Sequence, residues 1–122
     1  MDSLVLSKKV MNLLDDKKAG GIISIDVNKV TTLTDYFIIC TGTSDRHRKS
    51  LADEVQDLME NEKLDMLSKE GYRSADWILL DYGYVVVNIF SESAREKYNL
   101  ERLWSDGALS DLRKTNNPEE IK

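Results

Sequence analysis

The chain has 122 residues, of which 41% are hydrophobic and 32% charged, and its formal net charge is −5 at pH 7. This is enough apolar material for one core in one domain, and no run approaches the roughly 18 apolar residues that a membrane span requires. The negative charge disfavours extended binding to a phosphate backbone, which requires clustered cations, and suits a basic protein partner better.

The first predicted element is a helix at the N-terminus. Apolar residues recur at helical spacing from Leu6 to Leu14, Ser3 can cap the start, and two lysines followed by Gly20 can end the helix. The segment has neither the pattern of a secretory leader nor that of an organelle leader, so we expect a cytoplasmic protein. Apolar and polar side chains then alternate in residues 23–27, which predicts a strand with one solvent-exposed face.

The middle of the chain predicts a strand, a helix and a second strand. Residues 36–40 are apolar at every position, as in a central strand that is covered on both faces. From Leu51 to Met59 the apolar residues form one stripe of a helix. Residues 66–70 form a weaker strand. This order of elements favours a right-handed parallel crossover.

The last third predicts a hairpin and then a short helix. Residues 77–80 and 85–90 are rich in strand-forming residues, and Gly83 between them can adopt the positive φ of a tight turn. Ser93 and Glu96 have the spacing of a capping box, which starts a helix.

These elements predict one α/β domain over residues 1–107, with a mixed β-sheet of about five strands flanked by helices. A helical face at Leu100, Leu103 and Trp104 closes the domain before Gly107. Residues 108–122 have little to bury, so we expect a C-terminal tail that is partly mobile.

The turn Gly42-Thr43-Ser44, between the central strand and the next helix, is the first candidate for chemistry. A helix N-terminus there could accept an anion, but Ser44 can cap the same N–H groups, and capping is the favoured interpretation. The lysine of a P-loop and the three glycines of a dinucleotide fingerprint are missing. The neighbouring strand, VVVNIF, offers no carboxylates for the metal of a nucleotide transferase.

The chain has one cysteine, Cys40, and one histidine, His47. They are too few for a Cys/His zinc site or a Ser-His-Asp arrangement, and we expect Cys40 to be a small buried hydrophobe. No metal, cofactor or catalytic residue is therefore predicted.

Arg46, His47, Arg48 and Lys49 form a basic cluster in the first turn of the predicted central helix. We expect four solvated side chains. Peripheral contact with RNA phosphate, at the edge of a larger assembly, is the alternative.

Aromatic and acidic residues alternate through the last third without the paired carboxylates of a general acid and base. Such a mixture suits a contact surface, because aromatic side chains bury area and acidic neighbours complement a basic partner. Both tryptophans could equally be core residues, and composition leaves the two interpretations even. The aromatic residues are Trp77, Tyr82, Tyr84, Tyr98 and Trp104, and the acidic ones are Asp76, Asp81, Glu92, Glu96, Glu101 and Asp106.

The chain resembles the ribosomal silencing factor family, also called Iojap-like proteins, in three ordered stretches: LTDYFIICTGTSDRHRKSLADEV, EGYRSADWILLDYGYVVVNIF and REKYNLERLW. The resemblance extends over residues 4–107. The most family-like positions are Asp35, Tyr36, Gly42, Thr43 and Ser44, then Gly71, Trp77, Leu80, Asp81, Tyr82 and Gly83, then Arg95, Tyr98, Leu100, Glu101, Leu103 and Trp104.

That resemblance implies a fold with nucleotidyltransferase-like topology but without the catalytic carboxylates, and a homodimeric protein that is not an enzyme. It further implies binding to the large ribosomal subunit through its protein fourteen, which blocks joining of the small subunit and slows translation under nutrient limitation. The partner-binding residues that resemblance and interface composition select are Trp77, Leu80, Asp81, Tyr82, Tyr98, Leu100, Glu101 and Trp104.

Two positions depart from the family pattern. Tyr84 stands where an acidic residue is frequent, and Asn88 where a histidine is frequent. Two alternative functions stay open: a nucleotide-dependent transferase that uses the turn at residues 42–44, and an adaptor for another basic protein.

Overall fold

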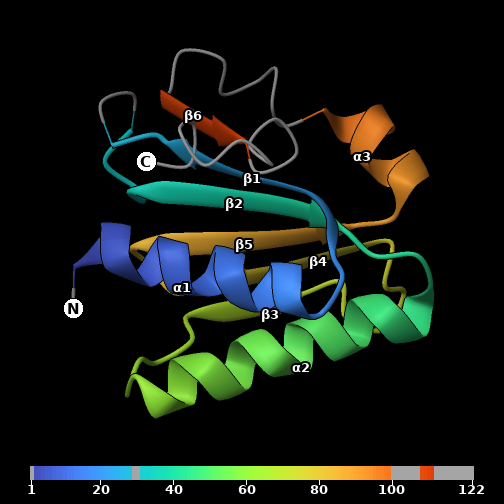
Figure 1. Ribbon diagram of the computed structural model, residues 1–122, viewed down its shortest axis with the longest axis horizontal. Helices are drawn as coiled ribbons and strands as arrows, with labels where there is room; N and C mark the ends of the chain where they lie inside the picture. The colour runs from blue at the N-terminus through green and yellow to red at the C-terminus, as the bar shows by residue number, and fades with distance from the viewer. Residues whose placement is uncertain (1, 29–30, 100–107, 112–122) are drawn as a thin grey trace.

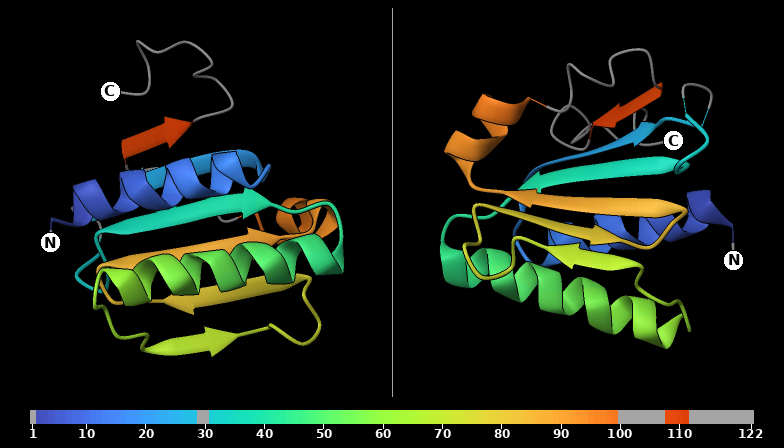
Figure 2. Two further views of the ribbon diagram at one scale, coloured as in Figure 1. Left: turned by 60° about the horizontal axis from the view of Figure 1, so that its bottom comes forward. Right: turned by 180° about the vertical axis from the view of Figure 1, so that it is seen from behind.

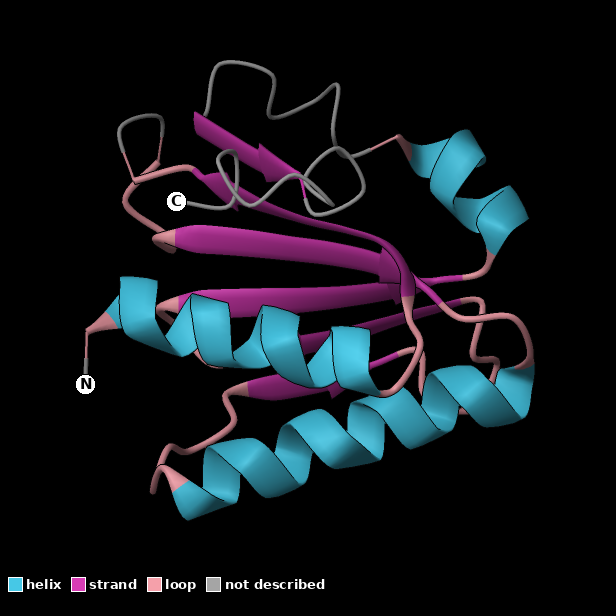
Figure 3. Ribbon diagram, viewed as in Figure 1, coloured by secondary structure: helices cyan, strands magenta, loops and turns pink. Residues whose placement is uncertain are grey.

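The computed structural model describes residues 2–28, 31–99 and 108–111. In these ranges three helices and six strands follow the order α1, β1, β2, α2, β3, β4, β5, α3, β6. The strands form one mixed sheet in the spatial order β3-β4-β5-β2-β1-β6, and α1 and α2 run side by side over one face (Figure 1; Figure 3). The predicted α/β class is confirmed, with one strand more than expected. Within the described ranges, no helix combines the length and apolarity needed to cross a membrane.

Helix α1 (Ser3–Asp16) and strand β1 (Gly20–Asp26) form where the sequence predicts them, with different boundary residues. Asp2, not Ser3, caps α1, because its carboxylate accepts a hydrogen bond from the backbone N–H of Leu4 at 3.1 Å. Lys18, not a glycine, adopts the left-handed conformation after the helix, with φ of 67°. Gly20 therefore does not end the helix and instead begins strand β1.

Strand β2 (Tyr36–Thr41) and helix α2 (Asp45–Asn61) match the sequence analysis closely. The apolar stripe of α2 is buried, including Leu51, Val55 and Met59. Ser44 is the N-cap, as predicted.

The two strands joined by the predicted crossover are parallel, as expected, but they are not neighbours in the sheet. Strand β3 (Ser68–Glu70) runs parallel to β2, yet it lies at the edge of the sheet, where it pairs antiparallel with β4 (Trp77–Asp81). The parallel neighbour of β2 is β5 (Val85–Phe90). Two strands thus separate the ends of the crossover, because the hairpin β4–β5 inserts between them.

The hairpin between β4 and β5 turns at Gly83, whose φ of 85° requires a residue without a Cβ, as predicted. The carboxylate of Asp81 accepts from the backbone N–H of Gly83 at 2.8 Å and holds this turn. The carbonyl of Tyr84 accepts from the backbone N–H groups of Asp35 and Tyr36, so the turn is also tied to the start of β2.

Helix α3 (Glu92–Tyr98) begins two residues earlier than the capping box predicts. Ser91, not Ser93, is its N-cap, because the Ser91 hydroxyl accepts from the backbone N–H of Ala94 at 3.2 Å. The predicted helical face at residues 100–104 lies outside the described residues.

Strand β6 (Ala108–Asp111) pairs antiparallel with β1 at the other edge of the sheet. These four residues fall in the segment that the sequence assigned to the C-terminal tail. A four-residue run without apolar alternation carries too little signal to predict a strand, whereas β1 offers an unpaired edge that the run can extend. The domain boundary after residue 107 stays a prediction.

The two faces of the sheet are covered differently (Figure 2). The helix-covered face holds the larger core, in which side chains of α1 and α2 pack on alternate residues of the central strands, such as Ile38, Val87 and Ile89. The opposite face carries a smaller core around Ile39 and Phe90, with Ala94 of α3 packed on it. Phe37 and Trp77 are only partly buried there.

Candidate functional site

Three aromatic rings meet on the opposite face of the sheet, and we call them the aromatic cluster: Trp77, Phe90 and Tyr98. The Trp77 ring centre lies 5.0 Å from that of Phe90 and 4.8 Å from that of Tyr98. Phe90 is buried, Trp77 is partly buried, and Tyr98 is 47% exposed. The cluster therefore extends from the buried ring of Phe90 to the exposed ring of Tyr98.

Asn88 fixes the orientation of the tryptophan. Its side-chain oxygen accepts from the indole Nε1–H of Trp77 at 3.0 Å, and its amide nitrogen donates to the carbonyl of Ile38 at 3.4 Å. Asn88 is 1% exposed, so both of its polar ends are satisfied inside the protein, as burial requires. Sequence reasoning noted this residue only as a departure from the family pattern. The signal that could have found it is one polar residue inside the apolar run VVVNIF.

Leu80 and Tyr82 lie away from the aromatic cluster. Successive side chains of a strand point to opposite faces, so Leu80 faces the helices while Trp77 faces the other way. Leu80 is fully buried and Tyr82 is 7% exposed, both in the larger core. Burial, and secondarily the charge of Glu60, raises the pKa of the Tyr82 phenol. The structure thus places these two predicted contacts in the interior.

Asp81 is half-buried at the far end of β4 from Trp77, and its carboxylate is engaged by the N–H of Gly83. Its first role is to hold the hairpin. The remaining predicted contacts, Leu100, Glu101 and Trp104, lie outside the described residues. Of the predicted set, the structure brings together Trp77 and Tyr98.

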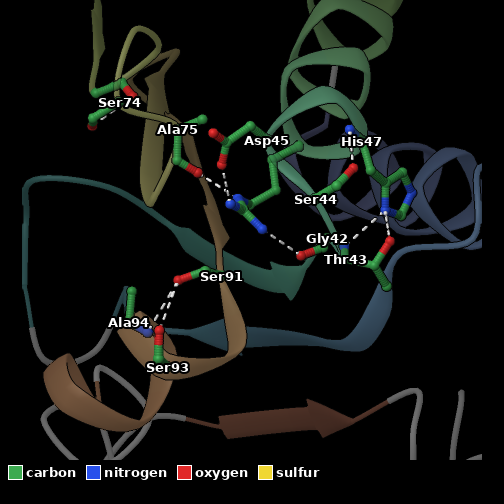
Figure 4. A network of polar contacts seen from close by, with 12 residues as sticks. Gly42, Thr43, Ser44, Asp45, His47, Ser74, Ala75, Ser91, Ser93 and Ala94 are labelled. Atoms are coloured by element: carbon green, nitrogen blue, oxygen red, sulfur yellow. Dashed lines mark hydrogen bonds and ion pairs between the residues drawn. The ribbon is translucent and has the colours of Figure 1, made fainter.

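The turn at residues 42–44 caps helix α2, and the N–H groups of Gly42 and Thr43 have acceptors within the protein (Figure 4). The Ser44 hydroxyl accepts from the backbone N–H of His47 at 3.0 Å, and Nδ1 of His47 accepts from the backbone N–H of Thr43 at 3.0 Å. The N–H of Gly42 donates to the carbonyl of Phe90. Ring atom Nε2 of His47 contacts the carbonyl of Lys17 at 2.9 Å, so this imidazole joins two loops.

Arg48 is not a solvated charge, and the prediction of four exposed cations is wrong at this position. Its side chain is 6% exposed, and its guanidinium donates to the carbonyls of Ala75 and Gly42 and pairs with Asp45. A Cβ at Gly42 would lie 2.5 Å from Cγ of Arg48, which explains the glycine. The arginine ties the turn, the loop before β4 and the start of α2 together.

A cavity of about 580 Å³ lies between this turn and the start of α3, where β2 and β5 end. The carboxyl ends of parallel strands are where α/β sheets commonly bind ligands. Here the cavity is lined by hydroxyl groups, by the carboxylates of Glu92 and Glu96, and by Arg48, whose guanidinium is already engaged by Asp45 and two backbone carbonyls. Two carboxylates disfavour a polyphosphate, so the cavity does not suit the nucleotide of a transferase.

Nucleophilic chemistry is equally poorly supported. Burial raises the pKa of the Cys40 thiol to about 12, against the opposing influence of Arg95, so the reactive thiolate does not form near neutral pH. In the described part of the chain, no group of three or more His, Cys, Asp or Glu residues is placed to hold a metal ion.

Comparison with known proteins agrees with these features. The family model described as "Ribosomal silencing factor during starvation" matches residues 1–122. The ribosomal silencing factor of Bacillus subtilis is 40% identical over 98 residues, which are 80% of this chain and 83% of that protein. An Iojap-related mitochondrial protein of Arabidopsis thaliana is 36% identical over 102 residues, which are 80% of this chain and 55% of that protein.

A crystal structure of a protein from Chromobacterium violaceum has the same fold. It superimposes with a TM-score of 0.83 at 36% sequence identity, and the match covers 86% of this chain and 88% of that one. The fold and the sequence matches agree, and the chain belongs to the ribosomal silencing factor family, whose function is the silencing of ribosomes.

Proposed function

We propose that the protein silences translation by binding the large ribosomal subunit through its protein fourteen, in a position that keeps the small subunit from joining. The mechanism is steric, so occupancy of the site is sufficient and no bond is made or broken. The protein acts in the cytoplasm, and a homodimer is its state away from the ribosome. Membership of the family supports the ribosomal target.

The aromatic cluster is the observation that supports a docking surface on the opposite face. Trp77 is rigid, since its indole is held by Asn88 and stacked on Phe90, and Tyr98 presents its ring beside it. Rigid, partly exposed aromatic residues lose little conformational entropy on binding and dominate many interfaces. The cluster is thus pre-organised for a protein partner.

Exposed carboxylates lie on the same segments of the chain as the aromatic cluster, and in our proposal they complement a basic ribosomal protein. Asp76 directly precedes Trp77, and Glu92 and Glu96 lie on α3, which also carries Tyr98. Charges at the rim of an interface chiefly raise the association rate. These three replace Asp81 as the acidic contacts in our proposal, while Leu100, Glu101 and Trp104 remain predicted contacts. Leu80 and Tyr82, which lie in the larger core on the other face, are not contacts in our proposal.

The experiment is a sucrose-gradient assay with purified subunits. The protein in molar excess is expected to migrate with large subunits and to reduce the fraction of joined particles. A pull-down with purified protein fourteen tests the docking partner separately. Undiminished joining at saturating protein contradicts steric silencing, and absence of protein fourteen from the pull-down, with joining still blocked, contradicts only the choice of partner.

A further inference from the structure

A basic patch forms on the other side of the molecule from the aromatic cluster. It consists of Lys49 and Lys69, whose ammonium groups lie over the Tyr72 ring, together with the exposed Arg46 on α2 and the exposed Arg73 next to Tyr72 in the chain. The Nζ atoms of Lys69 and Lys49 lie 4.0 Å and 5.6 Å from the centre of the Tyr72 ring. Three separate elements contribute: the first two turns of α2, the edge strand β3 and the loop that follows it.

Arg46 stands three residues before Lys49, so the two side chains share one face of α2. Arg73 follows Tyr72 directly and is exposed. The Tyr72 hydroxyl donates to Asp53 at 3.0 Å, and this hydrogen bond raises the pKa of the phenol. The tyrosine is thereby held against α2, with the ammonium groups of Lys49 and Lys69 over its ring.

None of these four cations is neutralised within the described residues. The ion pairs found there are Lys9–Glu62, Lys17–Glu54 and Arg48–Asp45, and they use other groups. Of the carboxylates in the first three turns of α2, Asp45 pairs with Arg48, whereas Asp53 accepts from the neutral Tyr72 hydroxyl and keeps its negative charge beside the patch. Glu70 points to the opposite face of β3 from Lys69, because successive side chains of a strand alternate.

The patch also lies at the positive end of the α2 dipole. Four unpaired cations at one place are conspicuous in a chain whose net charge is −5. Because like-signed side chains brought together destabilise the free protein, a ligand of opposite charge gains affinity from their assembly.

We propose that the basic patch binds the phosphate backbone of structured RNA on the large ribosomal subunit, as a second attachment beside the aromatic cluster. This inference rests on the proposed function, which places the protein against a particle rich in RNA. Lysine and arginine that neutralise phosphates release counterions and bind without reading sequence. The Tyr72 ring is already occupied by lysines, so it does not stack on a base and the contact is made to the backbone.

The geometry allows both contacts at once. The patch and the aromatic cluster lie on opposite faces of the sheet but at the same end, where β2 and β5 finish and α2 begins (Figure 1). Trp77 is only four residues beyond Arg73. One attachment to protein and one to RNA would fix the orientation of the domain on the subunit, which steric exclusion requires.

The test compares two double variants that each remove two positive charges. Lys49→Ala with Arg73→Ala changes the patch, and Lys8→Ala with Lys9→Ala changes α1, whose Lys9 makes only a surface ion pair. Affinity for purified large subunits is measured by cosedimentation from 50 to 300 mM KCl. Thermal unfolding of both variants checks that each is folded.

We expect the patch variant to bind about tenfold more weakly at low salt and to reduce the slope of log K against log salt by about 1.5, since each lost phosphate contact contributes about 0.7 to 0.9. The control variant should retain the wild-type slope. Equal slopes for both variants, with wild-type protein still bound, overturn the RNA contact alone. Failure of the wild type to bind overturns the proposed function as well.

An acidic protein surface is distinguished from RNA by ultraviolet crosslinking of the bound complex. After nuclease digestion, peptides that contain residues 46–49 or 69–73 should carry nucleotide adducts. A weakened patch variant without such adducts in the wild type would contradict RNA and point to an acidic ribosomal protein at this place.

Discussion

The helix-covered face and the opposite face of the sheet serve different purposes, although the same strands build both. The first is dry and continuous, with α1 and α2 packed on residues such as Val87 and Ile89. The second has a smaller core, a buried asparagine and an aromatic rim of which Tyr98 is 47% exposed. Strand β4 displays the contrast within five residues, because Leu80 belongs to the first face and Trp77 to the second. One face supplies stability, and in our proposal the other supplies the surface that recognises a partner.

The largest expected effect is on the helix-covered face. Leu80→Ala should lower the free energy of unfolding by about 3 kcal/mol, since it removes a fully buried side chain and leaves a cavity. Urea unfolding followed by circular dichroism measures the loss. A change below 1 kcal/mol would mean that Leu80 is not the core residue described above, and its predicted role as a contact would return.

Asn88→Ala should cost about 2 kcal/mol of stability, because the indole N–H of Trp77 and the carbonyl of Ile38 both lose a partner in a buried place. Asn88→His is the matched variant, since an imidazole nitrogen can again accept from the indole. We expect His to restore part of the stability and of the near-ultraviolet circular dichroism signal of Trp77. If Ala and His behave alike, Asn88 does not position the tryptophan.

A further effect depends on pH and tests whether water reaches the helix-covered face. Because burial raises the pKa of Cys40 to about 12, the unfolded chain ionises this thiol first as pH rises above about 9. Stability should therefore fall between pH 9 and 12, by about 1.4 kcal/mol per pH unit. The thiol contributes no pH dependence below that window.

The Cys40→Ala variant isolates this contribution. Its unfolding free energy should fall less steeply than that of the wild type when both are measured at pH 8, 9 and 10. Parallel pH dependence in the two proteins would show that water reaches the thiol.

Local features of the fold could be predicted from the sequence, whereas features that depend on the assembled sheet could not. Helix α2 follows from its apolar stripe and Ser44, and the hairpin follows from Gly83, because each of these signals is local. The place of β3 at the sheet edge is not local, since it depends on the hairpin β4–β5 inserting beside β2. Strand β6 depends in the same way on an edge that only the assembled sheet provides.

The same distinction between local and tertiary information applies to the candidate site. The family resemblance selected Trp77 and Leu80 together, but the two-residue period of a strand sends them to opposite faces. Arg48 was counted among exposed cations, whereas the fold surrounds it with the carbonyls of Gly42 and Ala75 from two loops. The spacing of residues along the sequence indicates the position of a side chain on its own helix or strand. The residues that it contacts depend on the tertiary fold.

The central claim, that the aromatic cluster is the docking surface, is tested most directly by two tyrosines that are both exposed. Tyr98 lies in the cluster and Tyr84, 62% exposed, lies at the hairpin turn at the other end of the sheet. In cosedimentation with purified large subunits, Tyr98→Ala should weaken binding at least tenfold, about 1.4 kcal/mol, while Tyr84→Ala leaves it within twofold. Equal affinity of the two variants, or a larger loss with Tyr84→Ala, would contradict the account.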